Sequence, residues 1–281
     1  MRDHSLKRRE LIRKCVVYGL LIVLGVLFAL PFVWLVSTSL KEDNQLFVMP
    51  PIWIPNPIKW SNYREALNYI PFWLYLKNTL TIAILSTIGM LLSSSLVAYG
   101  FSRVQWPVRD VVFILVLATM MLPYQVTMIP LFIVFRNLGW IGTFKPLIIP
   151  SFFGGPFYIF LLRQFYLTLP MELSDAARID GCSELGIYYR LILPLSKPAL
   201  STVALFTFMA HWNDFLAPLI YLEDDTKYTL ALGLQQFQRQ YGMEWAMLMA
   251  TSVVVTVPII VLFFITQKTF VQGIALTGLK G

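Results

Sequence analysis

The sequence predicts an all-α polytopic membrane protein. Hydrophobic residues make up 57% of its 281 residues and charged residues only 13%, whereas soluble globular chains are about a quarter charged. The mean hydropathy is +0.68. Because a helix that crosses the bilayer needs about 20 mostly apolar residues, six segments qualify as transmembrane helices. They lie at roughly 15–40, 77–101, 111–135, 144–167, 198–222 and 246–270.

The first and fourth of these segments need separate justification. Residues 1–14 form a basic tail, as in a secretory signal, but the apolar run after it exceeds the usual signal core of about 7–15 residues. No small-residue cleavage site follows, so we interpret this run as an uncleaved first span. The fourth is interrupted by prolines and paired glycines at 154 and 155, which spans tolerate when neighbouring helices satisfy the freed backbone groups.

The distribution of basic residues predicts the orientation. With the N-terminus inside, the inner segments hold fourteen Lys and Arg residues and the outer segments hold eight, while acidic residues are equally divided. Cytoplasmic loops carry the excess of Lys and Arg, so both termini are expected in the cytoplasm. The net charge of +7 then reflects topology, and a nucleic-acid role finds no support.

Residues 168–197 form a polar cytoplasmic loop between the fourth and fifth spans. Pro170 suits the start of a helix, Gly181 suits the position just after its end, and Ser183 can cap a second short helix. We expect that second helix to run to about Leu191 and to be stopped by Pro194. The loop is therefore predicted to be two short helices joined at a glycine elbow.

Two uses of this loop are open on chemistry alone. One is an interfacial helix on the lipid headgroups, and the other is a docking element for a cytoplasmic protein. Residues 171–194 contain four acidic and two basic residues, whereas a lipid-surface helix is typically rich in Lys and Arg. The charge balance favours a protein partner.

The loop resembles the EAA loop of importer-type ABC transporter permeases, in which Glu-Ala-Ala precedes a glycine and then Ile-x-Leu-Pro. Asp175, Ala176, Ala177 and Gly181 occupy the first part of that motif, and residues 191–194 read Leu-Ile-Leu-Pro. Asp for Glu and Leu for Ile are the departures. The neighbouring stretches FLLRQFYLTLPMELSDAARIDG, RLILPLSKPALSTVALFTFMAHWNDFLAPLI and FVQGIALTGLKG are similar to the MalG-type subunit of carbohydrate-uptake ABC importers.

That resemblance implies an importer-type ABC permease fold over residues 15–281, with partners and a mechanism. The partners would be a second related permease, two ATPase subunits that bind ATP and Mg, an extracellular solute-binding protein and a sugar substrate. The loop would dock on an ATPase, and the C-terminal tail at about 271–281 would reach toward the ATPase pair. The coupling residues implied are Glu172, Asp175, Ala176, Ala177, Asp180, Gly181, Leu193 and Pro194. The setting would be a bacterial or archaeal cytoplasmic membrane.

No catalytic motif is present in the sequence. It contains no G-x-x-x-x-G-K-[ST] phosphate loop, no G-x-S-x-G, no H-E-x-x-H and no C-x-x-C. The two cysteines and two histidines have no metal-ligand spacing. We therefore expect a transporter subunit that is not an enzyme and binds no metal or cofactor itself.

Candidates for the translocation path lie on the fifth span. Asp214 is an acidic residue within an apolar segment, where a charge costs about 2.5–3.5 kcal/mol, so it must face protein or water. Thr207 and His211 share its helical face. This polar stripe could line the path or could be a buried staple between helices. The full candidate set is Thr207, His211, Asn213, Asp214, Tyr124 and Gln125.

The outer loop at 223–245 is glutamine-rich. Gln238, Arg239 and Tyr241 are candidate contacts for the solute-binding protein, and whether this loop enters the sugar cleft is left open.

Two other functions remain as alternatives. A glycerol-phosphate importer would favour basic groups along the path, and none stands out within spans two to six. A proton-coupled secondary transporter using His211 and Asp214 would be expected to show internal repeats with interrupted helices, and no such symmetry is visible.

Overall fold

The computed structural model describes the backbone of residues 2–239 and 242–278, and the side chains of 10–238 and 242–267. Within these ranges the chain is mostly helical. It divides into two compact units, Met1–Ile70 with Gln236–Thr256, and Pro71–Gln235 with Val257–Gly281.

The first unit holds the long helix α1, a folded connector and the start of α14. The stretch Glu10–Ser39 of α1 is long and apolar enough to cross a membrane. The helix continues through the basic segment 2–14, which was expected only as a tail. The elements of this unit are α1 Arg2–Ser39, η1 Asp43–Gln45, α2 Ser61–Tyr69, β1 Gln238–Arg239, β2 Gly242–Met243 and α14 Trp245–Gly278, whose later part belongs to the second unit.

Side-chain bonds to the backbone fold the connector between α1 and α2. Asn62 donates to the carbonyls of Ser39 (3.0 Å) and Lys41 (2.8 Å). Gln45 donates to the carbonyl of Asn56 at 2.8 Å. These bonds satisfy backbone groups that the proline-rich sequence leaves without a regular partner. The short strands β1 and β2 pair antiparallel, with Gln238 opposite Met243.

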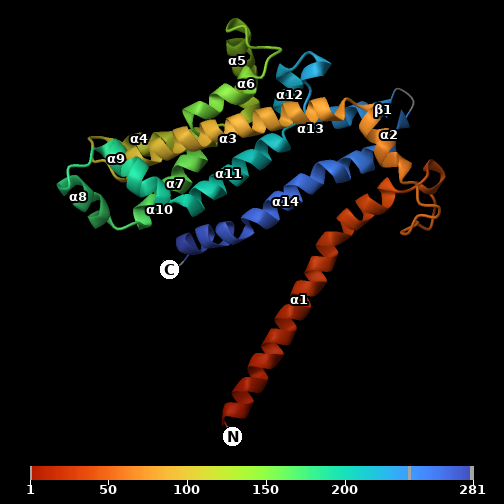
Figure 1. Cartoon of the computed structure of the whole chain (residues 1–281), viewed down its shortest axis with the longest axis horizontal. Coiled ribbons are helices and arrows are strands. Elements are labelled where there is room, and N and C mark those ends of the chain that lie inside the picture. The colour runs from red at the N-terminus through yellow and green to blue at the C-terminus, as the bar shows by residue number, and fades with distance from the viewer. Residues whose placement is uncertain (1, 240–241, 279–281) are drawn as a thin grey trace. The chain divides into compact units, whose positions relative to one another are not determined.

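The second unit is organised around α3, against which α7 and α11 pack (Figure 1). α3 buries small and hydroxyl residues, including Ala83, Ser86, Ser94 and Ala98, and such residues let apolar helices approach closely. The elements up to the polar loop are α3 Phe72–Ser102, α4 Arg109–Ala118, η2 Thr119–Met121, α5 Tyr124–Asn137, α6 Lys145–Ile148, η3 Ile149–Phe153 and α7 Pro156–Thr168. Those after it begins are α8 Met171–Ile179, α9 Glu184–Ile187, η4 Tyr188–Ile192, α10 Leu193–Leu195, α11 Lys197–Trp212, α12 Leu216–Tyr221, η5 Asp225–Lys227, α13 Leu230–Gly233 and η6 Leu234–Phe237, which reaches into the first unit.

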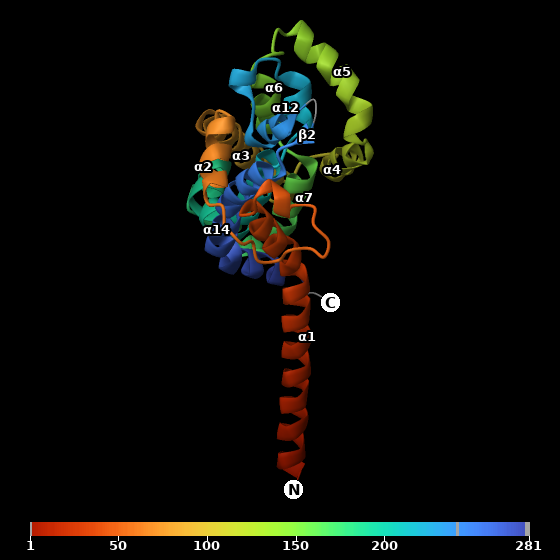
Figure 2. The same cartoon turned by 90° about the vertical axis from the view of Figure 1, so that its right-hand side faces the viewer.

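The predicted number of six spans agrees with the structure when bent helix pairs are counted as spans. Within the described residues, four helices are long and apolar enough to cross a membrane, and six if each bent helix pair counts as one span. The prediction of a continuous third span over 111–135 is wrong, because α4 and α5 meet at 97° (Figure 2). Pro123 has no N–H to continue the helix and disfavours helical backbone at Leu122, whose ψ is 110°.

The fourth and fifth spans are also interrupted. The fourth breaks between η3 and α7, where Gly154 adopts φ +82°, a conformation that glycine adopts without strain. The prediction of a fifth span over 198–222 is wrong in its bounds, since α11 ends at Trp212 and α12 begins at Leu216. The bent pair that can count as this span joins Glu184–Leu195 to Lys197–Trp212 at 79°. Residues 271–278, the predicted tail, continue α14, and 279–281 lie outside the described residues.

Candidate functional site

The polar loop folds as the predicted helix–elbow–helix, which we name the loop hairpin (Met171–Ile187). Gly181 adopts φ +79°. Its N–H donates to the carbonyl of Arg178 (3.0 Å), and the N–H of Cys182 donates to that of Ala177 (2.9 Å). These two bonds define a Schellman motif at the end of α8. Ser183 then caps α9 by accepting a hydrogen bond from the N–H of Gly186 at 3.2 Å.

The prediction that Pro194 stops the second helix is wrong. Helical backbone continues from α9 through the π-helical turn η4 and α10 to Leu195. The N–H of Leu193 bonds to the carbonyl of Tyr188, five residues earlier. A π turn shifts the hydrogen-bond pattern just where Pro194 lacks a donor, so the proline is accommodated inside the helix.

Arg178 cross-links the loop hairpin. It donates through Nε to Glu184 (2.7 Å) and through Nη1 to Asp175 (2.7 Å), joining α8 to α9. Its Nη2 also reaches the carbonyl of Arg103 at 3.3 Å. The hydrogen bond with Glu184 raises the pKa of Arg178. These hydrogen bonds from one guanidinium fix the angle between α8 and α9 at the Gly181 elbow.

Arg103, at the end of α3, holds the joint between α7 and α8. Its Nη2 donates to the carbonyls of Tyr166 and Leu169 (2.7 Å to the latter), and its Nη1 donates to that of Pro170 at 3.2 Å. These are the carbonyls at and just beyond the end of α7, where partial negative charge accumulates. The side chain is buried, 2% exposed overall. Burial lowers the pKa of Arg103, and the ring of carbonyls compensates its charge.

The predicted coupling residues divide into outward and inward sets. Ala177 packs inward against the core cluster of α3, α7 and α11, and Leu193 is half-buried. The neighbouring Tyr188 is half-buried and bonds through its hydroxyl to Ser95 at 2.7 Å. The outward set consists of Glu172, Asp175, Ala176, Asp180, Gly181 and Pro194.

Large apolar side chains stand beside the outward set. Ile179 is 86% exposed, Leu185 68% and Tyr189 71%. A rigid surface that combines exposed carboxylates with exposed apolar groups has the composition of a protein-docking surface.

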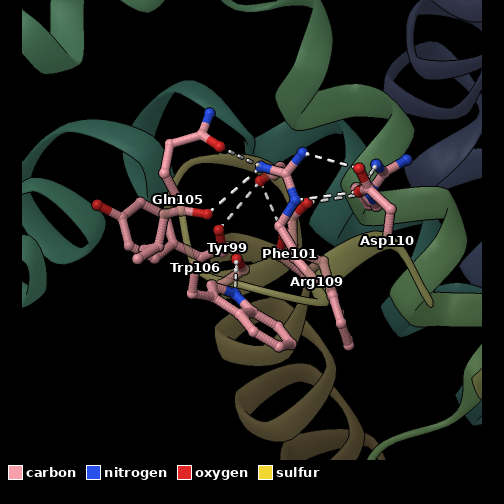
Figure 3. A network of polar contacts seen from close by, with 11 residues as sticks. Tyr99, Phe101, Gln105, Trp106, Arg109 and Asp110 are labelled. Atoms are coloured by element: carbon pink, nitrogen blue, oxygen red, sulfur yellow. Dashed lines mark hydrogen bonds and ion pairs between the residues drawn. The ribbon is translucent and has the colours of Figure 1, made fainter. Parts of the chain in front are cut away.

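A second polar network packs the turn between α3 and α4 (Figure 3). Arg109 donates through Nε to Asp110 (3.1 Å), which also accepts from Arg163 of α7 at 3.4 Å. The indole N–H of Trp106 donates to the carbonyl of Gly100 at 3.1 Å. This network holds the turn between α3 and α4 against α7, at the end of α3 that lies near the loop hairpin.

The opposite end of α3 binds the start of the predicted outer loop. Asn78 donates to the carbonyls of Thr226 (2.9 Å) and Tyr228 (3.0 Å), and the hydroxyl of Thr79 accepts from the N–H of Leu230 at 2.9 Å. The polar loop at 168–197 and the segment 224–230 therefore lie at opposite ends of α3, the alternation that the orientation analysis predicts.

Of the translocation candidates, Tyr124 is exposed at the start of α5, and Asp214 is half-buried between α11 and α12. Asp214 also accepts a hydrogen bond from the N–H of Ala217 at 3.2 Å, so it caps α12. Thr207 is 1% exposed, and its hydroxyl has no hydrogen-bond partner among the described residues.

The remaining path candidates differ in exposure. His211 is half-buried, Gln125 is exposed, and the exposed Asn213 donates to the carbonyl of Met209 at 2.9 Å. At the outer loop, Gln238 is exposed in β1 and Arg239 pairs with Gly242 in the hairpin. Tyr241 lies outside the described residues. No group of three or more potential metal ligands occurs in the part of the chain that the structure describes.

Sequence reasoning assigned no role to Arg103, Arg178 or Glu184. The opposite charges of Arg178 and Glu184 were visible, but their pairing depends on the elbow between them. Arg103 is bonded to residues more than sixty positions away in the chain, so nothing local in the sequence marks it.

Comparison with known proteins agrees with this geometry. Residues 89–275 match the family model described as the inner membrane component of binding-protein-dependent transport systems. The chain is 36% identical over 264 residues to the arabinooligosaccharides transport system permease protein AraQ of Bacillus subtilis, covering 92% of this chain and 93% of that one. It is 32% identical over 279 residues to the trehalose/maltose transport system permease protein MalG of Thermococcus litoralis, covering 98% and 99%.

The fold has a solved counterpart in a bacterial ABC transporter involved in the import of the acidic polysaccharide alginate. One chain of that crystal structure superposes with a TM-score of 0.79 at 23% identity, covering 92% of this chain and 96% of that chain. The chain described here is a multi-pass membrane protein and belongs to the family of inner membrane components of binding-protein-dependent transport systems.

Proposed function

We propose that this chain is the membrane-spanning permease subunit of an ATP-driven sugar importer that works with a solute-binding protein. The observation that carries the proposal is the loop hairpin, a rigid element with an exposed face of carboxylates and apolar side chains. Family membership supports the transport role, and the names of the relatives support carbohydrate as the substrate class.

In the proposed assembly, this chain forms half of a translocation path with a second, related permease. Two ATPase subunits bind ATP and Mg and receive the loop hairpin in a surface cleft. Asp175, Ala176 and Gly181 lie at that contact, with Ile179 beside them. The membrane is the cytoplasmic membrane of a bacterium or archaeon, and both termini lie inside.

The mechanism requires the hairpin to bind differently to the ATPases in their open and closed states, because only differential binding shifts a conformational equilibrium. ATP-driven closure then displaces the hairpin and rocks the spans from an inward-open to an outward-open path. Tyr124, Gln125, Thr207, His211, Asn213 and Asp214 are proposed to contribute to that path. Gln238, Arg239 and Tyr241 are proposed to contact the solute-binding protein, and the tail at 271–281 to approach the ATPase pair.

The test is co-purification. The tagged chain is extracted from its native membrane in mild detergent, and the bound subunits are identified by mass spectrometry. We expect an ATPase and a second permease in the wild-type complex. Asp175→Lys and Gly181→Pro should release the ATPase and keep the second permease, because both disrupt the outward face of the hairpin.

Two matched controls make the test specific. Asp43→Lys makes the same charge reversal on an exposed acid in the first unit. Gly139→Pro alters another glycine of left-handed conformation, with φ +65°. Both should leave the ATPase bound. Recovery of the chain without any ATPase from wild-type membranes would contradict the proposal and favour a proton-coupled transporter, while glycerol phosphate remains the alternative substrate if sugars fail.

A further inference from the structure

Three buried polar side chains lie at successive turns on one face of α3. Ser95, Tyr99 and Arg103 are 2%, 3% and 2% exposed and follow the i, i+4, i+8 spacing that aligns side chains along a helix. We call them the α3 ladder. An apolar span does not need buried polar groups for packing, and burying them costs free energy unless each is bonded.

Each member of the α3 ladder is bonded to a different part of the loop. Ser95 bonds to the hydroxyl of Tyr188 at 2.7 Å, just beyond the hairpin. The hydroxyl of Tyr99 donates to Oε2 of Glu184 at 2.6 Å, at the start of α9. Arg103 binds the carbonyls that connect α7 to α8. Both ends of the loop hairpin and its second helix are therefore attached to α3.

Glu184 is the centre of this arrangement. Its carboxylate accepts from Tyr99 on α3 and from Arg178 on α8, while its own backbone begins α9. Arg178 in turn reaches the carbonyl of Arg103. Three helices meet at one carboxylate, whose charge-assisted hydrogen bonds are the stronger kind.

We propose that the α3 ladder locks the loop hairpin to α3 as one rigid body, with Glu184 as the positioning residue. Without the α3 ladder, a displacement of the loop hairpin by the ATPase would only bend the chain at the Gly181 elbow and at the joint between α7 and α8. With the α3 ladder, the same displacement also moves α3, the helix against which α7 and α11 pack. This inference rests on the proposed function, since it concerns how force from the ATPase reaches the spans.

The test measures one distance in two states of the assembled complex. Cys15 and Cys182, the two cysteines of the chain, are changed to serine, and nitroxide labels are placed at Leu173 on α8 and Leu92 on α3. Leu173 is 40% exposed and Leu92 is 60% exposed. The label-to-label distance is measured by double electron–electron resonance without nucleotide and after trapping with Mg-ATP and orthovanadate.

Two conservative variants weaken the lock without changing side-chain shape, Tyr99→Phe and Glu184→Gln. Tyr166→Phe is the matched control, because Tyr166 is a 0% exposed tyrosine whose hydroxyl has no hydrogen-bond partner among the described residues. Arg103 contacts Tyr166 only through the backbone carbonyl of Tyr166, and the substitution leaves that carbonyl in place.

In the wild type and in Tyr166→Phe, we expect one narrow distance that is the same in both states. In Tyr99→Phe and Glu184→Gln, the distribution should broaden, and its mean should shift on trapping. A purely stabilising role would lower the thermal stability of these variants without making the distance depend on nucleotide.

Two results would overturn the inference. One is a wild-type distance that changes on trapping, and the other is a Glu184→Gln distribution identical to that of Tyr166→Phe. ATPase bound to each labelled complex is quantified in the same sample. If the ATPase is bound and either result is seen, only the inference about the α3 ladder is refuted. If the wild-type complex contains no ATPase, the proposed function is refuted as well.

Discussion

Arg103 in the second unit and Lys41 in the first are both buried cations just after a long apolar helix, 2% and 0% exposed. Arg103 donates through Nη1 and Nη2 to carbonyls at and beyond the end of α7, while its Nε has no hydrogen-bond partner among the described residues. Lys41 lies with Nζ 3.8 Å from the ring centroid of Trp34, and that atom has no hydrogen-bond partner among the described residues. One cation cross-links three helices, and the other stacks within its own segment.

The difference follows from side-chain chemistry. A guanidinium carries five donors in a planar fork and can bind several carbonyls at once, whereas an ammonium is a compact point charge. Burial lowers the pKa of Lys41 from its usual value of 10.5, and a single aromatic face compensates little of that cost. A buried charge therefore organises structure only where its donors are bonded to more than one element.

The largest effect is expected for Arg103→Met. Removing the guanidinium leaves buried carbonyls at the joint of α7 and α8 unbonded, each of which costs about 1–3 kcal/mol. We expect a loss of roughly 3 kcal/mol or more in the free energy of unfolding, seen as a lower Tm and aggregation in detergent. A variant as stable as the wild type would contradict this prediction, because Arg103 would then contribute no more to stability than Lys41.

The second largest effect is expected for Tyr99, an uncharged member of the α3 ladder. Tyr99→Phe removes a hydrogen bond to a carboxylate and should cost about 1.5–3 kcal/mol. Tyr166→Phe removes a buried hydroxyl without a bond among the described residues and should be neutral or slightly stabilising. Chemical denaturation of both variants in detergent checks the pair. Equal losses would show that the bond to Glu184 contributes nothing beyond packing.

The third effect separates backbone conformation from charge. Gly181→Ala and Gly139→Ala each place a Cβ at positive φ, +79° and +65°, with no atom within 4 Å of it. Each should cost about 1–2 kcal/mol, the penalty of left-handed backbone for an L-residue. Only Gly181→Ala should weaken ATPase retention in the co-purification assay. Equal retention by the two variants would mean that the elbow's conformation does not control docking.

The smallest effect is expected for Lys41→Met, which removes an unbonded buried charge and a cation–π contact of about 0.5–2 kcal/mol. At neutral pH the variant should be more stable than the wild type. Because the native pKa of Lys41 is lowered, the native state releases its proton first and the wild type gains stability as pH rises toward 10.5. Its Tm difference from the variant should narrow over that window, and a widening difference would contradict this.

Sequence reasoning succeeded where the signal is local. The apolar runs, the elbow at Gly181 and the cap at Ser183 depend on residues a few positions apart. The predictions from sequence were wrong or missing where tertiary packing determines the structure. A proline at 123 allows a kink or a full break, and the π turn that admits Pro194 is not encoded by any single residue. The bonds of Arg103 and Glu184 join distant segments, which one sequence does not reveal.

The most direct measurement is sugar uptake by the purified complex in liposomes, using the sugar that its solute-binding protein binds. ATP is enclosed on the side of the loop hairpin, and a protonophore collapses any proton gradient. We expect uptake that requires ATP, persists with the protonophore and falls sharply in Asp175→Lys. Uptake without ATP that stops with the protonophore would contradict it and would assign coupling to protons.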